Sequence, residues 1–363
     1  MIIKNGLVFT ENASFQQKDL HISNHKIVDS CTDGELYDAT GQYVIPGLID
    51  LHIHGAMGSD FSDGSVDGLR RISSYLYQHG ITSFCPTSMS YPEDTLTHIF
   101  TSATVQTPPC SSHIVGVHME GPFLSQTKKG AQNGDFLCSP NIPMFQRLYN
   151  QFGPMIKFVT LAPELDNAFE FIKRFHNVIH ISLGHTAATY ETATQALSLG
   201  SNHITHLFNG MLPLHHRNPG LIAAAMEHSN TTVELICDGF HVHPAMIRMA
   251  LQLFGDHRVI FISDSTRATG MPNGSYTLGG QSIYLHDRHV SLSDGTLAGS
   301  GSNLMDCMKN AVSYGIPLET AVKCCTINPA KKLGLFDRIG SLSIGKSADI
   351  VILDKTLNVV KVI

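Results

Sequence analysis

Val44–Gly55 (VIPGLIDLHIHG) decides the fold of this chain, because an apolar run there ends in two histidines one residue apart. In an extended strand, residues i and i+2 point to the same face. We therefore expect His52 and His54 to lie side by side where a strand gives way to a loop. Neutral imidazoles placed in this way are good ligands for a divalent ion such as zinc. A lone His-x-His is as often two unrelated strand histidines, so the rest of the chain must decide between these interpretations.

The composition predicts a soluble globular protein with ample core, since 42% of the 363 residues are apolar and 15% are charged. A net charge of -6 gives no reason to expect nucleic acid or an anionic membrane as partner. The start, Met1–Gly6, lacks the apolar core of a signal peptide, and no later run could span a bilayer. The eight cysteines contain no C-x-x-C pair, so we expect reduced thiols and a cytoplasmic location.

The two ends of the chain carry short alternating segments that predict one small β-sandwich domain, formed by residues 1–45 and 337–363. The C-terminal part of this domain contains the strand-like runs Ile350–Leu353 and Val359–Ile363. These are expected to pair with the N-terminal strands.

Between the ends, residues 46–336 alternate short apolar strands with helical segments, which is typical of a parallel sheet built from βαβ units. The eight strand candidates are Val44–His52, Ile81–Cys85, Ile114–Glu120, Ile156–Leu161, Val178–Leu183, His203–His206, Val233–Cys237 and Val259–Ser263. Eight units close a (β/α)8 TIM-type barrel. An open doubly wound sheet is the alternative, but no G-x-G-x-x-G turn follows the first strand. After the eighth strand, Tyr276–Gly280 and Ser282–Leu285 predict an inserted hairpin.

The predicted strands end mainly in histidines and carboxylates. In such a barrel, chemistry gathers where the strands end. Polar residues are common at strand ends because loops are exposed to solvent. This does not explain why the residues at these strand ends are mainly His, Glu and Asp. Four histidines and two carboxylates converging on one rim are ligands for one or two divalent ions. The six residues are His52, His54, Glu120, His185, His206 and Asp264.

The charges of these residues suggest their roles. Glu120 with His185 and His206 forms a three-ligand site open to water. Water on such an ion has a pKa near ~7, so hydroxide is available as a nucleophile. Asp264 is the natural general base, and it can return the proton to a leaving group. His118 has either a packed role or a role behind the ligands.

The motifs resemble those of the N-acetylglucosamine-6-phosphate deacetylases, a family of the amidohydrolase superfamily, over nearly the whole chain. The motifs are P-G-x-I-D-x-H-x-H (46–54), H-x-E-G-P (118–122), K-K-G-A (128–131), G-H-T (184–186), H-L-F-N-G-M (206–211), R-N-P-G (217–220), D-G-x-H (238–241), S-D-S-T (263–266) and G-T-L-A-G-S (295–300). The first is shared across the superfamily, including dihydroorotases and hydantoinases. The E-G-P and H-L-F-N-x-M motifs are specific to the deacetylases.

The resemblance implies hydrolysis of the acetamide of N-acetylglucosamine 6-phosphate to glucosamine 6-phosphate and acetate. It implies that Glu120, His185 and His206 bind the principal ion, and that His52 and His54 hold a second one. Asp264 would be the base and then the acid. The implied substrate contacts are Ala131, Gln132, Asn209, Gly210, Arg217, Asp238, Gly239, Phe240, His241, Leu297, Ala298 and Gly299. In the family the arginine reaches the phosphate in the neighbouring subunit's site, which implies a homodimer.

Two residues depart from the family pattern. Gln132 stands where relatives often have a histidine that polarises the amide carbonyl, and a glutamine is only a neutral donor. We hypothesise that the ion at His52 and His54 supplies this polarisation instead. Gly210 stands where alanine is common, a minor change if only backbone contacts the sugar. Zinc is the metal we expect, although iron, manganese, nickel and cobalt accept the same ligands.

Three alternatives remain open from the sequence. The first is the same reaction on N-acetylgalactosamine 6-phosphate, which differs only at the C4 hydroxyl. The second is a cyclic-amide hydrolase of the superfamily, although no lysine that could be carboxylated ends a strand here. The third is a non-catalytic sugar-phosphate-binding protein on the same barrel, which would be expected to have lost Asp264 or a ligand.

Overall fold

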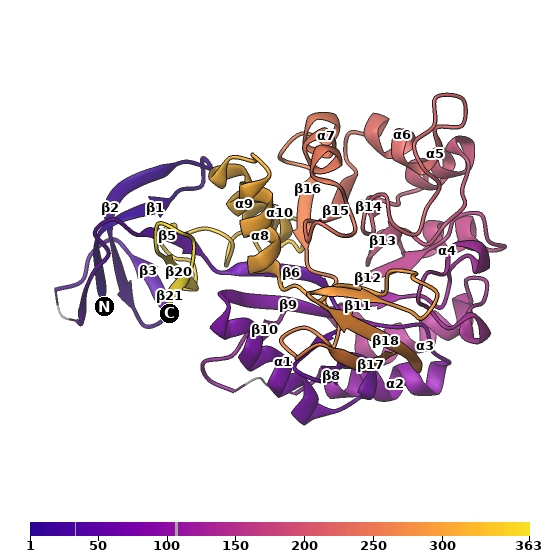
Figure 1. Cartoon of the computed structure of the whole chain (residues 1–363), viewed down its shortest axis with the longest axis horizontal. Coiled ribbons are helices and arrows are strands. Elements are labelled where there is room, and N and C mark those ends of the chain that lie inside the picture. Colours follow the sequence, from indigo (N-terminus) through magenta and orange to yellow (C-terminus); the bar gives the residue numbers. More distant parts are fainter. Residues whose placement is uncertain (33, 106–107) are drawn as a thin grey trace.

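The computed structural model describes residues 1–32, 34–105 and 108–363, and its main body is a parallel β-barrel (Figure 1). Among the described residues the eight barrel strands are β6 (Leu48–Ile53), β9 (Ile81–Ser88), β11 (Val117–Glu120), β12 (Ile156–Leu161), β13 (His180–Leu183), β14 (His203–Ile204), β15 (Thr232–Ile236) and β16 (Val259–Ile262). They pair in this order, with the two-residue β10 (His113–Ile114) beside β9. The Asp264 N–H donates to the His52 carbonyl at 2.9 Å, which joins the end of β16 to β6. The predicted TIM-type barrel is confirmed.

Helices, most of them amphipathic, surround the barrel. They are α1 (Val66–Gln78), α2 (Glu93–Ser102), α3 (Ile142–Phe152), α4 (Ala168–Phe175), α5 (Tyr190–Ser198), α6 (Gly220–Glu227), α7 (Pro244–Phe254), α8 (Leu304–Ser313), α9 (Leu318–Cys325) and α10 (Ile327–Lys332). In α1, the Ser65 hydroxyl caps the helix by accepting from the Gly68 N–H at 3.1 Å. Its residues Leu69, Ile72 and Leu76 are buried, since they recur at helical spacing on the face toward the strands.

The predicted first strand, Val44–His52, is wrong as a single element. It divides into β5 (Tyr43–Pro46), which pairs antiparallel with β20 (Ile350–Leu353), and β6, which belongs to the barrel. The break falls at Gly47, where a Cβ atom would lie 2.0 Å from the Thr82 hydroxyl oxygen. The run is apolar on both sides of the break because both halves are buried, so hydropathy alone does not reveal it.

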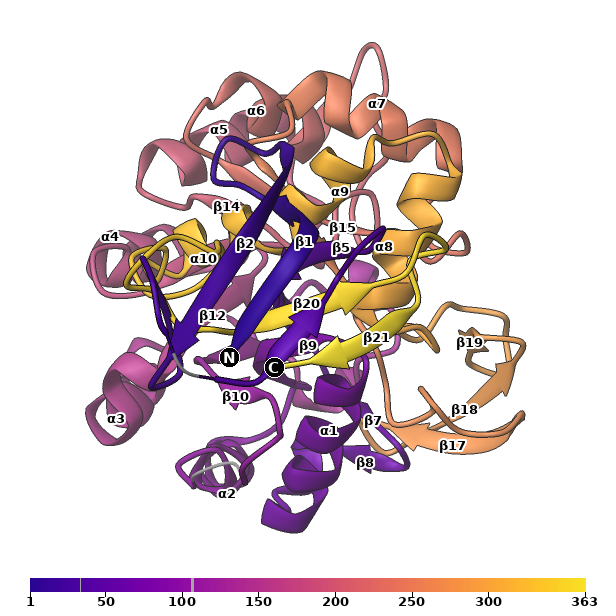
Figure 2. The ribbon, with the colours of Figure 1, turned by 90° about the vertical axis from the view of Figure 1, so that its left-hand side faces the viewer.

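The small β domain formed by both ends of the chain is confirmed. In the described residues its sheet has the order β21-β20-β5-β1-β2-β3, with β4 beside β1. The remaining elements are β1 (Ile2–Phe9), β2 (Phe15–Ser23), β3 (Lys26–Val28), β4 (Leu36–Asp38) and β21 (Val359–Val362). Figure 2 shows the two termini close together on this sheet. Its core includes Ile3, Val8 and Val44 from one end of the chain and Ile350 and Ile352 from the other.

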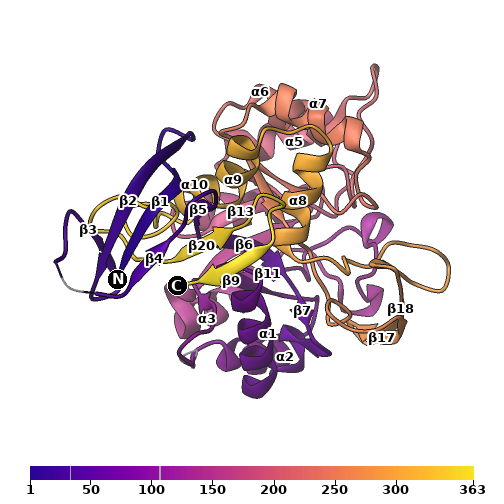
Figure 3. The same cartoon turned by 60° about the vertical axis from the view of Figure 1, so that its left-hand side comes forward.

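The predicted hairpin after the eighth strand is also present, as part of a small antiparallel sheet. Its strands are β17 (Gly274–Leu278), β18 (Gln281–His286) and β19 (His289–Ser291). Figure 3 shows this sheet on the other side of the barrel from the termini. Leu278 and Ile283 pack in one cluster with Met89 and Ala131, so the sheet forms one wall of the barrel mouth. The short β7 (Gly55–Ala56) and β8 (Ser59–Asp60) pair beside it. No helix in the described ranges is long and apolar enough to cross a membrane.

Candidate active site

The carboxyl ends of the barrel strands bring six side chains together. His52 lies in β6 and Glu120 ends β11, whereas His54, His185, His206 and Asp264 lie just beyond β6, β13, β14 and β16. All six are buried. The sequence therefore predicted which residues meet, although they are far apart along the chain.

One group consists of Glu120, His185 and His206. The Oε1 atom of Glu120 lies 3.1 Å from the His185 Nε2 and 3.0 Å from the His206 Nε2. The two Nε2 atoms are themselves 3.1 Å apart. This spacing suits three donors directed at a common cation.

A second group consists of His52, His54 and Asp264 together with the same glutamate. The His54 Nε2 lies 3.4 Å from the Glu120 Oε2 and 3.2 Å from the Asp264 Oδ1. The His52 Nε2 lies 3.5 Å from the Glu120 Oε1 and 3.6 Å from the Asp264 Oδ1. Glu120 thus lies between the two groups: its Oε1 faces His185, His206 and His52, and its Oε2 faces His54.

Backbone carbonyls determine which ring nitrogen of three of these histidines carries the proton. The Nδ1 atoms of His54, His185 and His206 lie 3.1, 2.8 and 3.2 Å from the carbonyls of Thr87, Lys128 and Asn209. A carbonyl only accepts, so Nδ1 carries the hydrogen and Nε2 presents a lone pair to the site.

These contacts fit a divalent ion, since lone pairs on Nε2 facing each other and a carboxylate need a cation between them. Two buried atoms, His52 Nε2 and Asp264 Oδ1, also have no hydrogen-bond partner in the part of the chain that is described. Burial raises the pKa of Glu120, but protonation of His52 and His185 would outweigh it and lower that pKa well below its ordinary value. A divalent ion bound by the neutral imidazoles would supply positive charge in the same place. The site therefore keeps its carboxylate ionised and ready for a cation.

Three of the six residues have left-handed backbone conformations. The φ angles are 47° for His185, 28° for His206 and 50° for Asp264. Such conformations are uncommon for residues other than glycine, and they cluster at functional sites. They let the chain turn sharply after a strand while the side chain still points into the mouth.

A cavity of about 230 Å³ opens above this site. Of the predicted substrate contacts, it is lined by Ala131, Gln132, Asn209, Gly210, His241, Leu297 and Gly299. His54, Glu120, His185, His206 and Asp264 form its floor.

The other predicted substrate contacts do not line this cavity. Asp238 lies behind His241, with its Oδ2 2.7 Å from the His241 Nδ1. Burial lowers the pKa of His241, but the hydrogen bond and charge of Asp238 outweigh this effect and raise it. Ala298 is buried in the cluster beneath β17–β19, and Phe240 is 45% exposed.

Gly239 and Arg217 also lie outside the cavity. Gly239 has a φ of 87°, and a Cβ atom there would meet the Tyr314 hydroxyl at 2.4 Å. Arg217 is exposed, with its Nη1 2.7 Å from the His216 Nε2. Arg217 is therefore not part of the cavity of this chain.

Gln132 is held at both ends of its carboxamide. Its Oε1 accepts from the Ser90 N–H at 2.8 Å, so its Nε2 must face Glu120, to which it donates at 2.8 Å. The side chain is only 2% exposed. Gln132 thus orients the glutamate shared by both groups.

Sequence reasoning missed Glu234, a fully buried carboxylate on β15 inside the barrel. Its Oε2 lies 3.0 Å from the His52 Nδ1. The signal was a charged residue within the apolar run Val233–Cys237. His118, whose role was left open, packs against the His52 ring with centroids 4.6 Å apart and does not line the cavity. Burial lowers the pKa of His118 to about 3.

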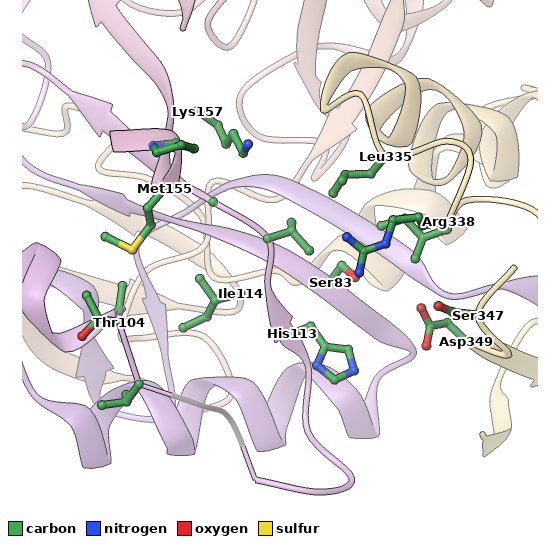
Figure 4. Close-up of a pocket in the computed structure, with 16 residues that line it drawn as sticks. Ser83, Thr104, His113, Ile114, Met155, Lys157, Leu335, Arg338, Ser347 and Asp349 are labelled. Carbon is green, nitrogen blue, oxygen red and sulfur yellow. The ribbon is translucent and has the colours of Figure 1, made fainter. Parts of the chain in front are cut away.

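A second cavity, of about 880 Å³, lies at the opposite end of the barrel (Figure 4). Residues from the starts of the strands, such as Ser83 and Lys157, line it together with Arg338 and Asp349 from the C-terminal segment. Its lining shares no residue with the histidine and carboxylate groups found in the described chain. We therefore assign the chemistry to the smaller cavity.

The chain is similar to known proteins along nearly its whole length. Residues 43–363 match the model of the amidohydrolase family. The N-acetylglucosamine-6-phosphate deacetylase of Bacillus subtilis (strain 168) is 35% identical over 374 residues, covering 99% of this chain and 94% of that protein. The deacetylase structure from Pasteurella multocida is similar with a TM-score of 0.93 at 29% identity, covering 100% of this chain and 97% of the other. A mutant of the Mycobacterium smegmatis deacetylase, in complex with N-acetyl-D-glucosamine-6-phosphate, gives 0.93 at 31% identity, with the same coverage.

Proposed function

Since the chain belongs to the amidohydrolase family, and within it to the N-acetylglucosamine-6-phosphate deacetylases, we propose that the six side chains at the barrel mouth carry out this reaction. The chain catalyses the metal-dependent hydrolysis of the acetamide of N-acetylglucosamine 6-phosphate to glucosamine 6-phosphate and acetate. The alternatives considered from the sequence are not favoured by these relatives. The observation that carries the assignment of the site is the meeting of three imidazole lone pairs and two carboxylates beneath one cavity.

In this proposal Glu120, His185 and His206 hold the principal ion, and His52 and His54 hold a second. When bound, divalent ions lower the pKa of water and polarise a carbonyl. Zinc is the proposed metal, because nitrogen and carboxylate donors at this spacing suit it, and iron, manganese, nickel and cobalt are the alternatives.

Asp264 is the proposed general base and acid. Burial raises the pKa of Asp264, but the hydrogen bond with His54 and positive charge beside it, on protonated His52 and His54 or on an ion that they bind, outweigh this effect and lower it. Asp264 is therefore ionised at neutral pH and can accept a proton from the attacking water. It then donates this proton to the amide nitrogen, which leaves as the amine of the sugar.

The remaining cavity residues are proposed to orient the sugar. Asp238 fixes the ring of His241, so that its Nε2 is available to a substrate hydroxyl. Asn209 and the backbone near Gly210 and Leu297 supply further polar contacts. Gly239, Phe240 and Ala298 would act through the shape of their loops, since they do not border the cavity.

In this proposal a second ion, held by His52 and His54, would supply the carbonyl polarisation that the family resemblance assigns to a histidine in place of Gln132. The supporting observation is that Gln132 donates one N–H to Glu120 and accepts with its oxygen from the Ser90 N–H, so these groups are not free to polarise the substrate carbonyl. A metal count near one per fully active subunit would contradict this part of the proposal.

The protein is proposed to form a homodimer in which Arg217 binds the phosphate in the neighbouring site. Arg217 is exposed and does not line the cavity of its own chain, which supports a role in the site of another subunit. Its paired N–H donors suit a phosphate dianion. A cytoplasmic location remains a prediction, consistent with the free cysteines of the described chain.

An acetate-release assay on both 6-phospho-N-acetylhexosamines, with metal analysis of the same sample, tests the proposal. We expect turnover of the gluco substrate, faster than of the galacto epimer, and close to two ions per subunit. Metal-loaded protein that releases no acetate from the gluco substrate would refute the proposed function.

A further inference from the structure

We propose that Glu234 is a positioning residue that holds a ligand of each ion from inside the barrel. The inference rests on the proposed function, since it assumes that His52 and His206 are metal ligands. It concerns a residue behind the site, which contacts neither the cavity nor the substrate.

Glu234 makes close contacts with both sets of proposed ligands. Its Oε2 lies 3.0 Å from the His52 Nδ1 and also accepts from the His206 backbone N–H at 3.1 Å. Its Oε1 lies 3.1 Å from the His203 Nε2. One buried carboxylate therefore contacts the side chain of a ligand of the second ion and the main chain of a ligand of the first.

The contact with His52 determines which nitrogen of that ring faces the mouth. An ionised carboxylate only accepts hydrogen bonds, so the His52 Nδ1 carries the hydrogen and its Nε2 presents a lone pair toward Glu120 and Asp264. In His54, His185 and His206, a backbone carbonyl holds the hydrogen on Nδ1 in the same way. In His52, the side chain of Glu234 does so instead of a backbone carbonyl.

Burial makes a purely space-filling role for Glu234 a poor explanation. The residue is 0% exposed, and a charge in such a place is costly unless it is fully hydrogen-bonded. A leucine or methionine would fill the same volume without this cost. Either residue would, however, leave the His52 Nδ1–H and the His206 backbone N–H without hydrogen-bond partners inside the barrel, and each unpaired buried donor is unfavourable. The carboxylate of Glu234 is therefore explained by these two hydrogen bonds.

His52, His118 and Glu234 are also close enough to form a deeper metal site, but their hydrogen bonds argue against it. The His118 Nδ1 faces the Leu51 carbonyl at 3.3 Å and therefore carries a hydrogen. Its Nε2 accepts from the Thr160 hydroxyl at 2.7 Å. No lone pair of His118 is left for a cation, so Glu234 acts through hydrogen bonds.

The experiment compares the purified full-length protein with Glu234→Ala, Glu234→Gln and Thr160→Val. Metal content is measured by elemental analysis and zinc affinity by competition with a chelator. The melting temperature of each metal-free protein shows whether it folds. Thr160→Val is the matched control, because it removes a polar group inside the same barrel that contacts none of the proposed ligands.

Glu234→Ala is expected to weaken zinc binding about 10–100-fold, the usual effect of removing a group that orients a ligand. Glu234→Gln should weaken zinc binding only a few-fold, because its carbonyl oxygen can still accept from His52 and His206 but is a weaker acceptor than a carboxylate. Thr160→Val should bind zinc as the wild type does. Wild-type affinity in Glu234→Ala would overturn the proposal, as would an equal loss in Thr160→Val. If Glu234→Ala does not fold, wild-type affinity in Glu234→Gln overturns it.

The same measurements separate this proposal from the proposed function. A wild-type protein with one ion would contradict only the two-ion mechanism, and Glu234 would then be judged by the affinity for that ion. Inactive wild-type protein would contradict the proposed function but leave the comparison of zinc affinities intact.

Discussion

Asp264→Asn is expected to preserve the fold, the metal content and substrate binding while lowering kcat by two to four orders of magnitude. Asparagine has almost the same shape as aspartate, but its amide does not accept a proton from water. It also tolerates the left-handed conformation at this position, where φ is 50°. The backbone hydrogen bonds to the His52 carbonyl, at 2.9 Å, and from the Ser300 N–H, at 2.7 Å, need no side chain and should remain.

The magnitude follows from the role assigned to the carboxylate. A positioned general base contributes about 10²–10⁴ in rate. At about 1.36 kcal/mol for each factor of ten, its loss raises the barrier by about 2.7–5.4 kcal/mol. Asp264→Ala removes the same base and adds a residue that is strained at positive φ by about 1–2 kcal/mol, so its melting temperature should also fall.

The assay is acetate release under single-turnover and steady-state conditions, with metal analysis of each sample. Equal metal content in wild type and Asp264→Asn makes the rate a direct measure of the base. A kcat within a few-fold of the wild-type value would remove Asp264 from that role. The reaction would then need another proton acceptor at the mouth.

Arg217→Ala should raise KM for the phosphorylated sugar far more than for the unphosphorylated one in steady-state assays, and equal effects would reject the phosphate assignment. Gln132→Leu should weaken zinc binding by up to about 10–150-fold in chelator competition, because Glu120 loses a hydrogen bond worth about 1.5–3 kcal/mol. Unchanged affinity would argue against the orienting role. Burial lowers the pKa of Lys332 to about 7, so the folded state binds fewer protons than the unfolded state between that value and the ordinary 10.5. The contribution of Lys332 to the free energy of unfolding therefore rises as the pH is raised from about 7 to 10.5. Lys332→Met should lose this increase in stability with pH. The difference in free energy of unfolding between mutant and wild type, measured by urea titration, should therefore change by up to about 2.7 kcal/mol between pH 7 and 9. A difference that stays constant with pH would contradict the lowered pKa of Lys332.

The sequence was sufficient to predict the barrel and the six histidines and carboxylates that meet at its mouth. The alternation of short apolar strands and helices is local, and so is the presence of a histidine or carboxylate at a strand end. Parallel strands place their carboxyl ends at one edge, so residues as far apart as His52 and Asp264 could be assigned to one site without coordinates. The division of Val44–His52 at Gly47 was not predictable in this way, because both halves are equally apolar.

Only the tertiary structure decided the orientation of the ligands. Which nitrogen of a histidine faces the cation depends on what lies behind the ring, and those partners come from other strands and loops: Lys128 behind His185, and Glu234 behind His52. The same is true of Gln132, whose amide is oriented by the Ser90 N–H. The kind of residue at a strand end is a property of the local sequence. The direction of its lone pairs depends on hydrogen bonds between distant segments, and these exist only after the chain has folded.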